Sequence, residues 1–257
     1  MPLIYLTNYS KVNADIKLFT EGVIMKFVWE HNGDDTLLYS VDFIGAYIRG
    51  ENLDVAISKA EAELRSYSVW AGKSLALPFE VEIVQEKESD LQINDADSDV
   101  LFDCEKEPLT PDEYAELKAL ALKSASDFHK LYSSIADKST SCLPTRKTFY
   151  GNAPRTAHEM YEHTKNVNTY YFGEIGIDVG SDGTIFDCRQ KGFELLEQTA
   201  GFMNNTVIEG SYAELWSVRK MLRRFLWHDR IHAKAMYRMA IKTFGADSVQ
   251  NTFKFIV

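Results

Sequence analysis

Two histidines separated by one helical turn are the residues of this sequence most suited to chemistry. His228 and His232 lie in the segment 224–236, whose apolar residues recur with the period of a helix. At about 3.6 residues per turn, both histidines share a face with Phe225, so their imidazoles are expected to point toward the interior. Two inward imidazoles at this spacing can bind one ion. The pattern therefore favours a divalent metal site over two hydrogen-bonded core histidines.

A third histidine, His163, lies in line with Met160 on a predicted helix that begins near Thr156. Catalytic zinc is bound by three protein ligands and keeps one position open for water or substrate. The predicted cofactor is therefore a divalent metal, Zn²⁺ or alternatively Ni²⁺, Fe²⁺ or Mn²⁺, at a His₃ site. The alternative is that His163 only packs beside Tyr170 and Tyr171.

The motif His-Asp-x-x-His is similar to the zinc-protease pattern His-Glu-x-x-His, in which the glutamate is the general base. Here Asp229 is shorter than glutamate, and no histidine follows His232, so the third ligand must come from upstream. We expect Asp229 to support a ligand or to lie at the surface. Glu159, one turn before His163, is a candidate catalytic base, although it also fits a helix cap. The remaining histidines, His31, His129 and His158, are expected to be structural.

The second half of the chain has the start signals of several helices. Capping boxes, in which a hydroxyl and a glutamate satisfy free amides at a helix start, are predicted at Thr110–Glu113, Thr156–Glu159 and Ser211–Glu214. A further helix is predicted at 186–202. Four helices in about 150 residues are typical of a four-helix bundle.

The first half reads as a small sheet with one helix. Two runs rich in β-branched and aromatic residues, 23–30 and 37–43, flank a turn and predict a hairpin. Helical spacing follows over 53–72, and strict alternation over 79–84 predicts another strand. A strand at 4–9 is also plausible from its composition. The predicted fold class is α+β, with this sheet followed by the helical bundle.

An acidic segment separates the two halves. Between positions 80 and 105 there are ten acidic residues and a single lysine. We predict an α/β domain at 1–95, an acidic linker at 96–106 and the helical domain at 107–257. Because the linker has little apolar surface, it is expected to be exposed, to leave two separate cores and to be cleaved by proteases.

The charge of the chain restricts its partners. The net charge is −10, and residues 1–106 contain 9 Lys and Arg against 20 Asp and Glu, so the first half would repel nucleic acid. No run approaches the about 18 apolar residues of a membrane helix, and no signal peptide is evident, so a cytoplasmic protein without a membrane partner is expected. Cys104, Cys142 and Cys188 are expected to be reduced thiols.

The histidine-bearing helices resemble those of a known family. Residues 156–163 with 171–173, and residues 221–232, are similar to the second and fourth helices of the DinB family of divalent-metal proteins, over roughly 107–245. The resemblance implies a metal site of His163, His228 and His232, and frequent homodimerisation. It also implies thiol transfer with bacillithiol, mycothiol or glutathione as the low-molecular-weight thiol, an activity found among the family's members.

The first half resembles a different family. Residues 43–57 are similar to the stretch that joins hairpin and helix in the HicB-like fold of antitoxins, over roughly 20–90. No DNA-binding helix-turn-helix or ribbon is attached to it. A domain that gates the substrate or mediates oligomerisation is therefore expected in place of an antitoxin.

Together these features predict a metal-dependent enzyme acting on a small molecule, in its leading form a thiol S-transferase. The metal would lower the pKa of a bound thiol, and a nearby arginine would pair with the carboxylates of the thiol. Two alternatives remain: a metal-dependent hydrolase with Glu159 as base, and a non-enzymatic, antitoxin-like interaction protein with a structural metal. The arginines considered are Arg155, Arg223, Arg224 and Arg230, and Arg230 is the second candidate catalytic residue with Glu159.

Overall fold

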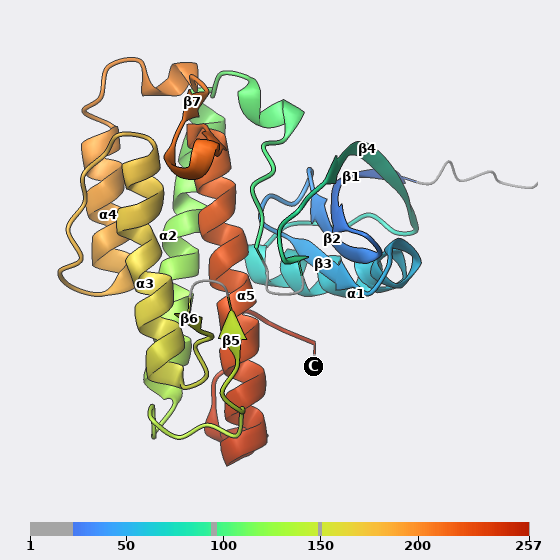
Figure 1. Ribbon diagram of the computed structural model, residues 1–257, viewed down its shortest axis with the longest axis vertical. Coiled ribbons are helices and arrows are strands. Elements are labelled where there is room, and N and C mark those ends of the chain that lie inside the picture. The colour runs from blue at the N-terminus through green and yellow to red at the C-terminus, as the bar shows by residue number, and fades with distance from the viewer. Residues whose placement is uncertain (1–22, 94–96, 149–150, 257) are drawn as a thin grey trace, which may run out of the picture.

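The structure is a computed structural model that describes residues 23–93, 97–148 and 151–256. The predicted strand at 4–9 lies outside the described residues. The protein has a mixed α+β fold, with a small sheet on one side and long helices on the other (Figure 1). None of the helices in the described ranges has the length and apolar character needed to cross a membrane.

The sheet has four strands in the order β3-β2-β1-β4. Its strands are β1 (Val23–Asn32), β2 (Asp35–Ser40), β3 (Tyr47–Gly50) and β4 (Phe79–Glu88). β1 and β2 form the predicted antiparallel hairpin, with Gly33 at a φ of 58° in its turn. β4 pairs with β1 in parallel, because the chain returns through a helix before β4 begins.

That helix, α1 (Leu53–Ala71), confirms the prediction at 53–72. The Asn52 side chain accepts a hydrogen bond from the Val55 amide at its start, and Gly72 ends it with a φ of 68°, in the left-handed region. The predicted strand at 79–84 is also confirmed and extends to Glu88. Its four glutamates are exposed to solvent and alternate with half-buried residues.

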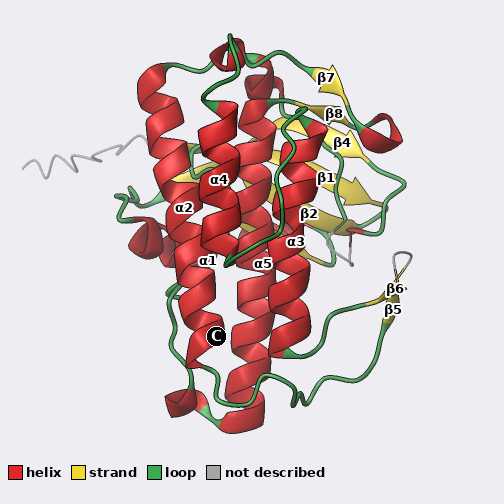
Figure 2. Cartoon of the chain, turned by 90° about the vertical axis from the view of Figure 1, so that its left-hand side faces the viewer, coloured by secondary structure: helices red, strands yellow, loops and turns green. Residues whose placement is uncertain are grey.

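Four helices lie side by side in the second half of the chain (Figure 2). They are α2 (Pro111–Ser134), α3 (Ala157–Glu174), α4 (Ile185–Leu196) and α5 (Val218–Phe244). The predicted capping boxes at Thr110 and Thr156 are confirmed. Short strand pairs join these helices: β5 (Lys147–Thr148) with β6 (Gly151–Asn152), and β7 (Ile208–Glu209) with β8 (Leu215–Trp216).

The third predicted capping box is wrong. Ser211 begins only a short 3₁₀ turn, because Tyr212 and Ala213 both have a φ of 59°, which cannot continue a helix. α5 starts instead after Ser217, whose hydroxyl accepts from the Lys220 amide. The helix predicted at 186–202 is shorter than expected and ends at Leu196.

The prediction of an exposed linker between separate cores is wrong. Ser98, Val100, Phe102 and Glu105 are all buried, and the Glu105 carboxylate forms an ion pair with Arg223 of α5. The acidic segment can be buried because this guanidinium compensates its charge. Buried residues of the sheet and of all five helices also belong to one continuous apolar cluster.

Candidate metal centre

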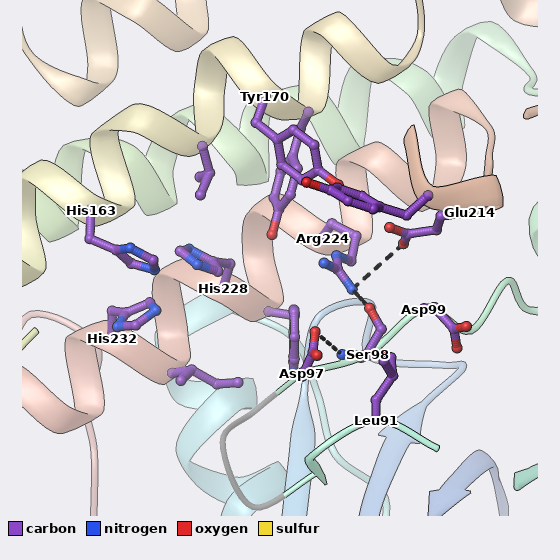
Figure 3. Close-up of a pocket in the computed structure, with 15 residues that line it drawn as sticks. Leu91, Asp97, Ser98, Asp99, His163, Tyr170, Glu214, Arg224, His228 and His232 are labelled. Carbon is purple, nitrogen blue, oxygen red and sulfur yellow. Dashed lines mark hydrogen bonds and ion pairs between the residues drawn. The ribbon is translucent and has the colours of Figure 1, made fainter. Parts of the chain in front are cut away.

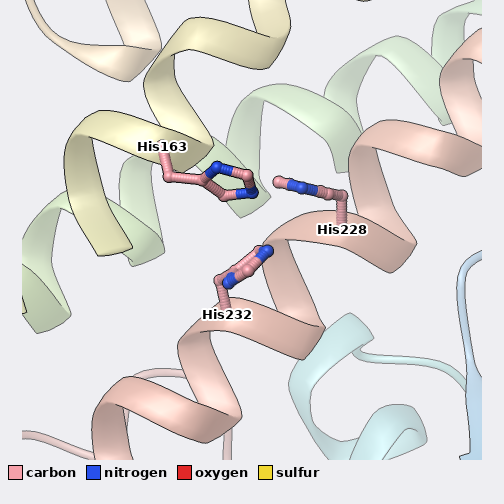
Figure 4. A group of neighbouring side chains, drawn as sticks. All are labelled: His163, His228 and His232. Atoms are coloured by element: carbon pink, nitrogen blue, oxygen red, sulfur yellow. The ribbon is translucent and has the colours of Figure 1, made fainter. Parts of the chain in front are cut away.

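Three imidazoles converge between α3 and α5 (Figure 4). One nitrogen from each of His163, His228 and His232 lies within 4.8 Å of the others. The ring centroids of His228 and His232 are 4.4 Å apart, and those of His163 and His232 are 4.6 Å apart. The structure thus brings together the three histidines that the helical phase singled out.

The helices determine this convergence. His228 and His232 are one turn apart on α5, so they share a face. α3 packs against that face and presents His163 to it. Tyr171 of α3 contacts the His228 ring edge-on, at 5.9 Å between centroids, and helps to leave His228 only 9% exposed.

The triad consists of uncharged bases. Burial lowers the pKa of His163 and lowers that of His232 to about 3. Burial, followed by the proximity of His232 and His163, holds the pKa of His228 well below its usual range. Near neutral pH the three imidazoles are therefore uncharged, which is the form that binds a metal cation. The buried Nδ1 atom of His228 also has no hydrogen-bond partner among the described residues. An all-imidazole donor set of this kind fits Zn²⁺, Ni²⁺ or Fe²⁺.

The triad forms one end of a cavity of about 710 Å³ (Figure 3). The cavity lies between α3, α5, the segment around Ser98 and the loop that precedes β8. Its aromatic walls are Tyr170, Tyr171, Tyr212 and Trp227. Its acidic and basic side chains besides the histidines are Asp97, Asp99, Glu214 and Arg224. A volume of this size accommodates a small-molecule ligand.

The two candidate catalytic residues lie elsewhere, and neither lines the cavity as the described residues define it. Glu159 caps α3: its carboxylate accepts from the backbone amides of Arg155 at 2.8 Å and of Thr156 at 3.1 Å. The first of these bonds is the main reason why the pKa of Glu159 is lowered. The buried Arg230 guanidinium lies over the Tyr67 and Trp70 rings, 4.9 and 5.0 Å from their centroids.

Of the four arginines considered from the sequence, Arg224 is the one that lines the cavity. It donates a hydrogen bond to the Ser98 carbonyl and lies 4.0 Å from the Glu214 carboxylate. Arg155 bonds instead to the Leu143 carbonyl, and Arg223 pairs with Glu105. Sequence reasoning did not place Asp97, Asp99 and Glu214 at this site, because segments distant along the chain bring them to the cavity.

Asp229 neither supports a metal ligand nor lies at the surface, so both expectations for it are wrong. It is fully buried and forms a bidentate ion pair with Arg189 of α4, at 2.5 and 3.1 Å. The other histidines lie outside the triad in hydrogen bonds of their own. His129 bonds to the Tyr161 hydroxyl at 2.9 Å, and His158 bonds to that of Tyr132 at 3.3 Å.

No protein-family model matches the sequence, and comparisons with curated proteins and with solved structures give no match either. The resemblances to DinB and HicB-like proteins therefore rest on the residues quoted for them.

Proposed function

We propose that this chain is a DinB-like divalent-metal protein that acts as a thiol S-transferase on a small-molecule substrate. The observation that carries the proposal is the geometry of His163, His228 and His232. Their neutral imidazoles meet within 4.8 Å at the end of a cavity of about 710 Å³. These residues would hold Zn²⁺, or alternatively Ni²⁺, Fe²⁺ or Mn²⁺, and the cavity would receive a low-molecular-weight thiol.

The composition of the triad supports catalysis over a structural role. Structural zinc usually has four protein ligands, whereas catalytic zinc has three and an open position. Within the described residues, the grouping contains three potential ligands. A divalent ion bound there would lower the pKa of a thiol in the open position, so that the thiolate forms near neutral pH. The aromatic walls would limit access of water to it.

The position of Glu159 disfavours the hydrolase alternative. A general base must reach the water that it deprotonates and have a pKa near the working pH. The Glu159 carboxylate is engaged with two backbone amides, which hold its pKa below the usual range. The transferase needs no such base, because the metal itself acidifies the thiol.

The first half has a supporting role in this proposal. We infer a HicB-like fold for it, supported by the order of three strands, a helix and a fourth strand. Asp97, Ser98 and Asp99, which follow this sheet along the chain, line the cavity. That position suits a domain that shapes the substrate site. We also propose that the chain forms a homodimer and is located in the cytoplasm.

The test is a titration of Co²⁺-substituted protein with glutathione, bacillithiol and cysteine. Coordination of a thiolate should produce a sulfur-to-cobalt charge-transfer band. His163→Ala should abolish the band, whereas Cys142→Ser, at an exposed thiol outside the triad, should leave it unchanged. If all three thiols leave the spectrum unaltered while cobalt stays bound, the transferase proposal fails.

A further inference from the structure

The cavity has two chemically different ends (Figure 3). The neutral histidines form one end, and carboxylates gather toward the other. Asp97 and Asp99 come from the segment that follows the sheet, and Glu214 comes from the loop before α5. A ligand held at the triad would therefore extend toward acidic groups.

The segment with the two aspartates is fixed from both sides. Ser98 donates from its hydroxyl to the buried Glu30 carboxylate of β1 at 2.6 Å, and the Asp99 amide donates to the same carboxylate at 3.3 Å. From α5, Lys220 donates to the Asp99 carbonyl at 2.7 Å and Arg224 donates to the Ser98 carbonyl. Because these bonds hold the main chain, the segment that carries the two aspartates is fixed before any ligand arrives.

The cations near this wall are buried and already engaged. Lys220 is fully buried and pairs with Glu214 at 2.8 Å. Arg224 is 7% exposed, and its guanidinium lies 4.7 Å from the centroid of the Trp227 ring. Asp97 and Asp99 are only half-buried, so a ligand in the cavity reaches these carboxylates more readily than it reaches the buried Arg224, which also lines the cavity. The Asp97 carboxylate also accepts a hydrogen bond from the Ser98 amide at 3.1 Å.

Two further features indicate that this space receives a ligand. His228, nine-tenths buried, lines the same cavity, and its Nδ1 atom has no hydrogen-bond partner in the part of the chain that the structure describes. Tyr170, Tyr171 and Trp227 line the same cavity. Aromatic faces beside carboxylates favour an ammonium group over a carboxylate.

We propose that the wall formed by Asp97 and Asp99 selects a thiol that carries a positively charged ammonium group. This inference rests on the proposed thiol-binding function and names the class of its ligand. The sulfur would lie at the triad, and the ammonium group would lie in the field of the two aspartates. A thiol with a carboxylate in place of the ammonium group would be repelled.

Three thiols with the same two-carbon spacer test the proposal. Cysteamine, 2-mercaptoethanol and 3-mercaptopropionate differ in charge, and the charge-transfer band of the Co²⁺ protein measures the affinity for each. The three thiols also differ in acidity, but this difference is the same for every protein variant. The informative quantity is therefore how the ratio of the cysteamine affinity to the 3-mercaptopropionate affinity changes between variants. Asp97→Asn and Asp99→Asn should each lower this ratio about five-fold. Glu82→Gln, which removes the same charge from the solvent face of β4, should leave it unchanged.

A second measurement requires no variant. Raising the ionic strength should lower the ratio in the unmodified protein, because salt screens the aspartates. If the thiols bind but neither the aspartate variants nor salt alters the ratio, the selective wall is refuted and the proposed function stands. If none of the three thiols, nor glutathione, bacillithiol or cysteine, produces the band while cobalt remains bound, the proposed function itself fails.

Discussion

Two adjacent residues of α5 belong to different buried polar clusters. One cluster contains both charges of an ion pair, and the other contains only neutral bases. Asp229 meets the Arg189 guanidinium, and both side chains are fully buried. Arg189 also donates to the Asn168 side chain at 3.0 Å and to the Ala121 carbonyl at 3.1 Å. His228, one position earlier, meets two other bases, and burial is the main cause of its lowered pKa.

This difference separates a structural cluster from a binding site. The Arg189–Asp229 pair contains both charges, so it is complete within the protein. The triad contains three neutral bases that crowd their nitrogens together without an acid among them. A shared divalent cation is the ligand that a cluster of neutral imidazoles can bind. The same helix therefore contributes to an ion pair whose two charges compensate each other and to a cluster suited to bind an external ion.

The largest expected effect follows from breaking the complete pair. Asp229→Ala should lower the free energy of unfolding by about 3–5 kcal/mol, because it leaves a buried guanidinium without a counter-charge. Urea unfolding measures the loss. Replacing both members, as Asp229→Leu with Arg189→Met, should recover most of it. A loss below about 1 kcal/mol in the single variant would remove the distinction between the two clusters.

The next effect concerns the triad. His228→Ala should weaken divalent-metal binding by more than about 100-fold, beyond the loss typical of residues that only support a ligand. Metal analysis after dialysis against a weak chelator would measure this. His158→Ala, at an exposed histidine bonded to Tyr132, should retain the metal content of the unmodified protein. Full occupancy in the His228 variant would refute the metal site.

The metal-free protein should show the cost of keeping His232 uncharged. Its pKa is about 3 in the folded protein, against 6.5 for an ordinary histidine. Between these values the unfolded chain binds a proton that the folded protein does not, so stability falls as pH falls from about 6.5 toward 3. The slope for this one group approaches about 1.4 kcal/mol per pH unit. Urea unfolding with chelator present should give a flatter profile for His232→Gln than for the unmodified protein.

The smallest effect is expected for an ion pair on the surface. Arg65 and Glu61 of α1 lie 2.8 Å apart with both side chains more than half exposed. Arg65→Ala should lower the free energy of unfolding by only about 0.3–0.5 kcal/mol, because water and salt screen the pair. The same urea experiment measures it. A loss as large as that of Asp229→Ala would show that burial does not distinguish these ion pairs.

The sequence predicted those features in which the local backbone geometry decides where a side chain points. Helical phase alone placed His228 and His232 on one inward face, and it aligned His163 with the buried side of α3. The hairpin and α1 were likewise predictable from alternation, turn residues and periodicity. In each case the backbone geometry fixes where a side chain points, so no distant contact is needed to infer it.

Features that depend on distant contacts were missed. The Ser211–Glu214 spacing fits a capping box, yet Glu214 pairs with Lys220, and backbone angles ahead of it prevent a helix. No spacing rule pairs Arg189 with Asp229 or brings Asp97 to the cavity. The buried acidic segment was unpredictable for the same reason, since its counter-charge, Arg223, comes from the last long helix.

The position of Trp227 has a consequence for the order of assembly. One face of the sheet, with Val28, Leu37 and Tyr39, is covered by Phe102 and by this indole from α5. During synthesis the sheet leaves the ribosome well before α5 exists. The part of this apolar face that Trp227 covers therefore stays exposed in the nascent chain until α5 has been synthesised, and an exposed apolar face of this kind promotes aggregation.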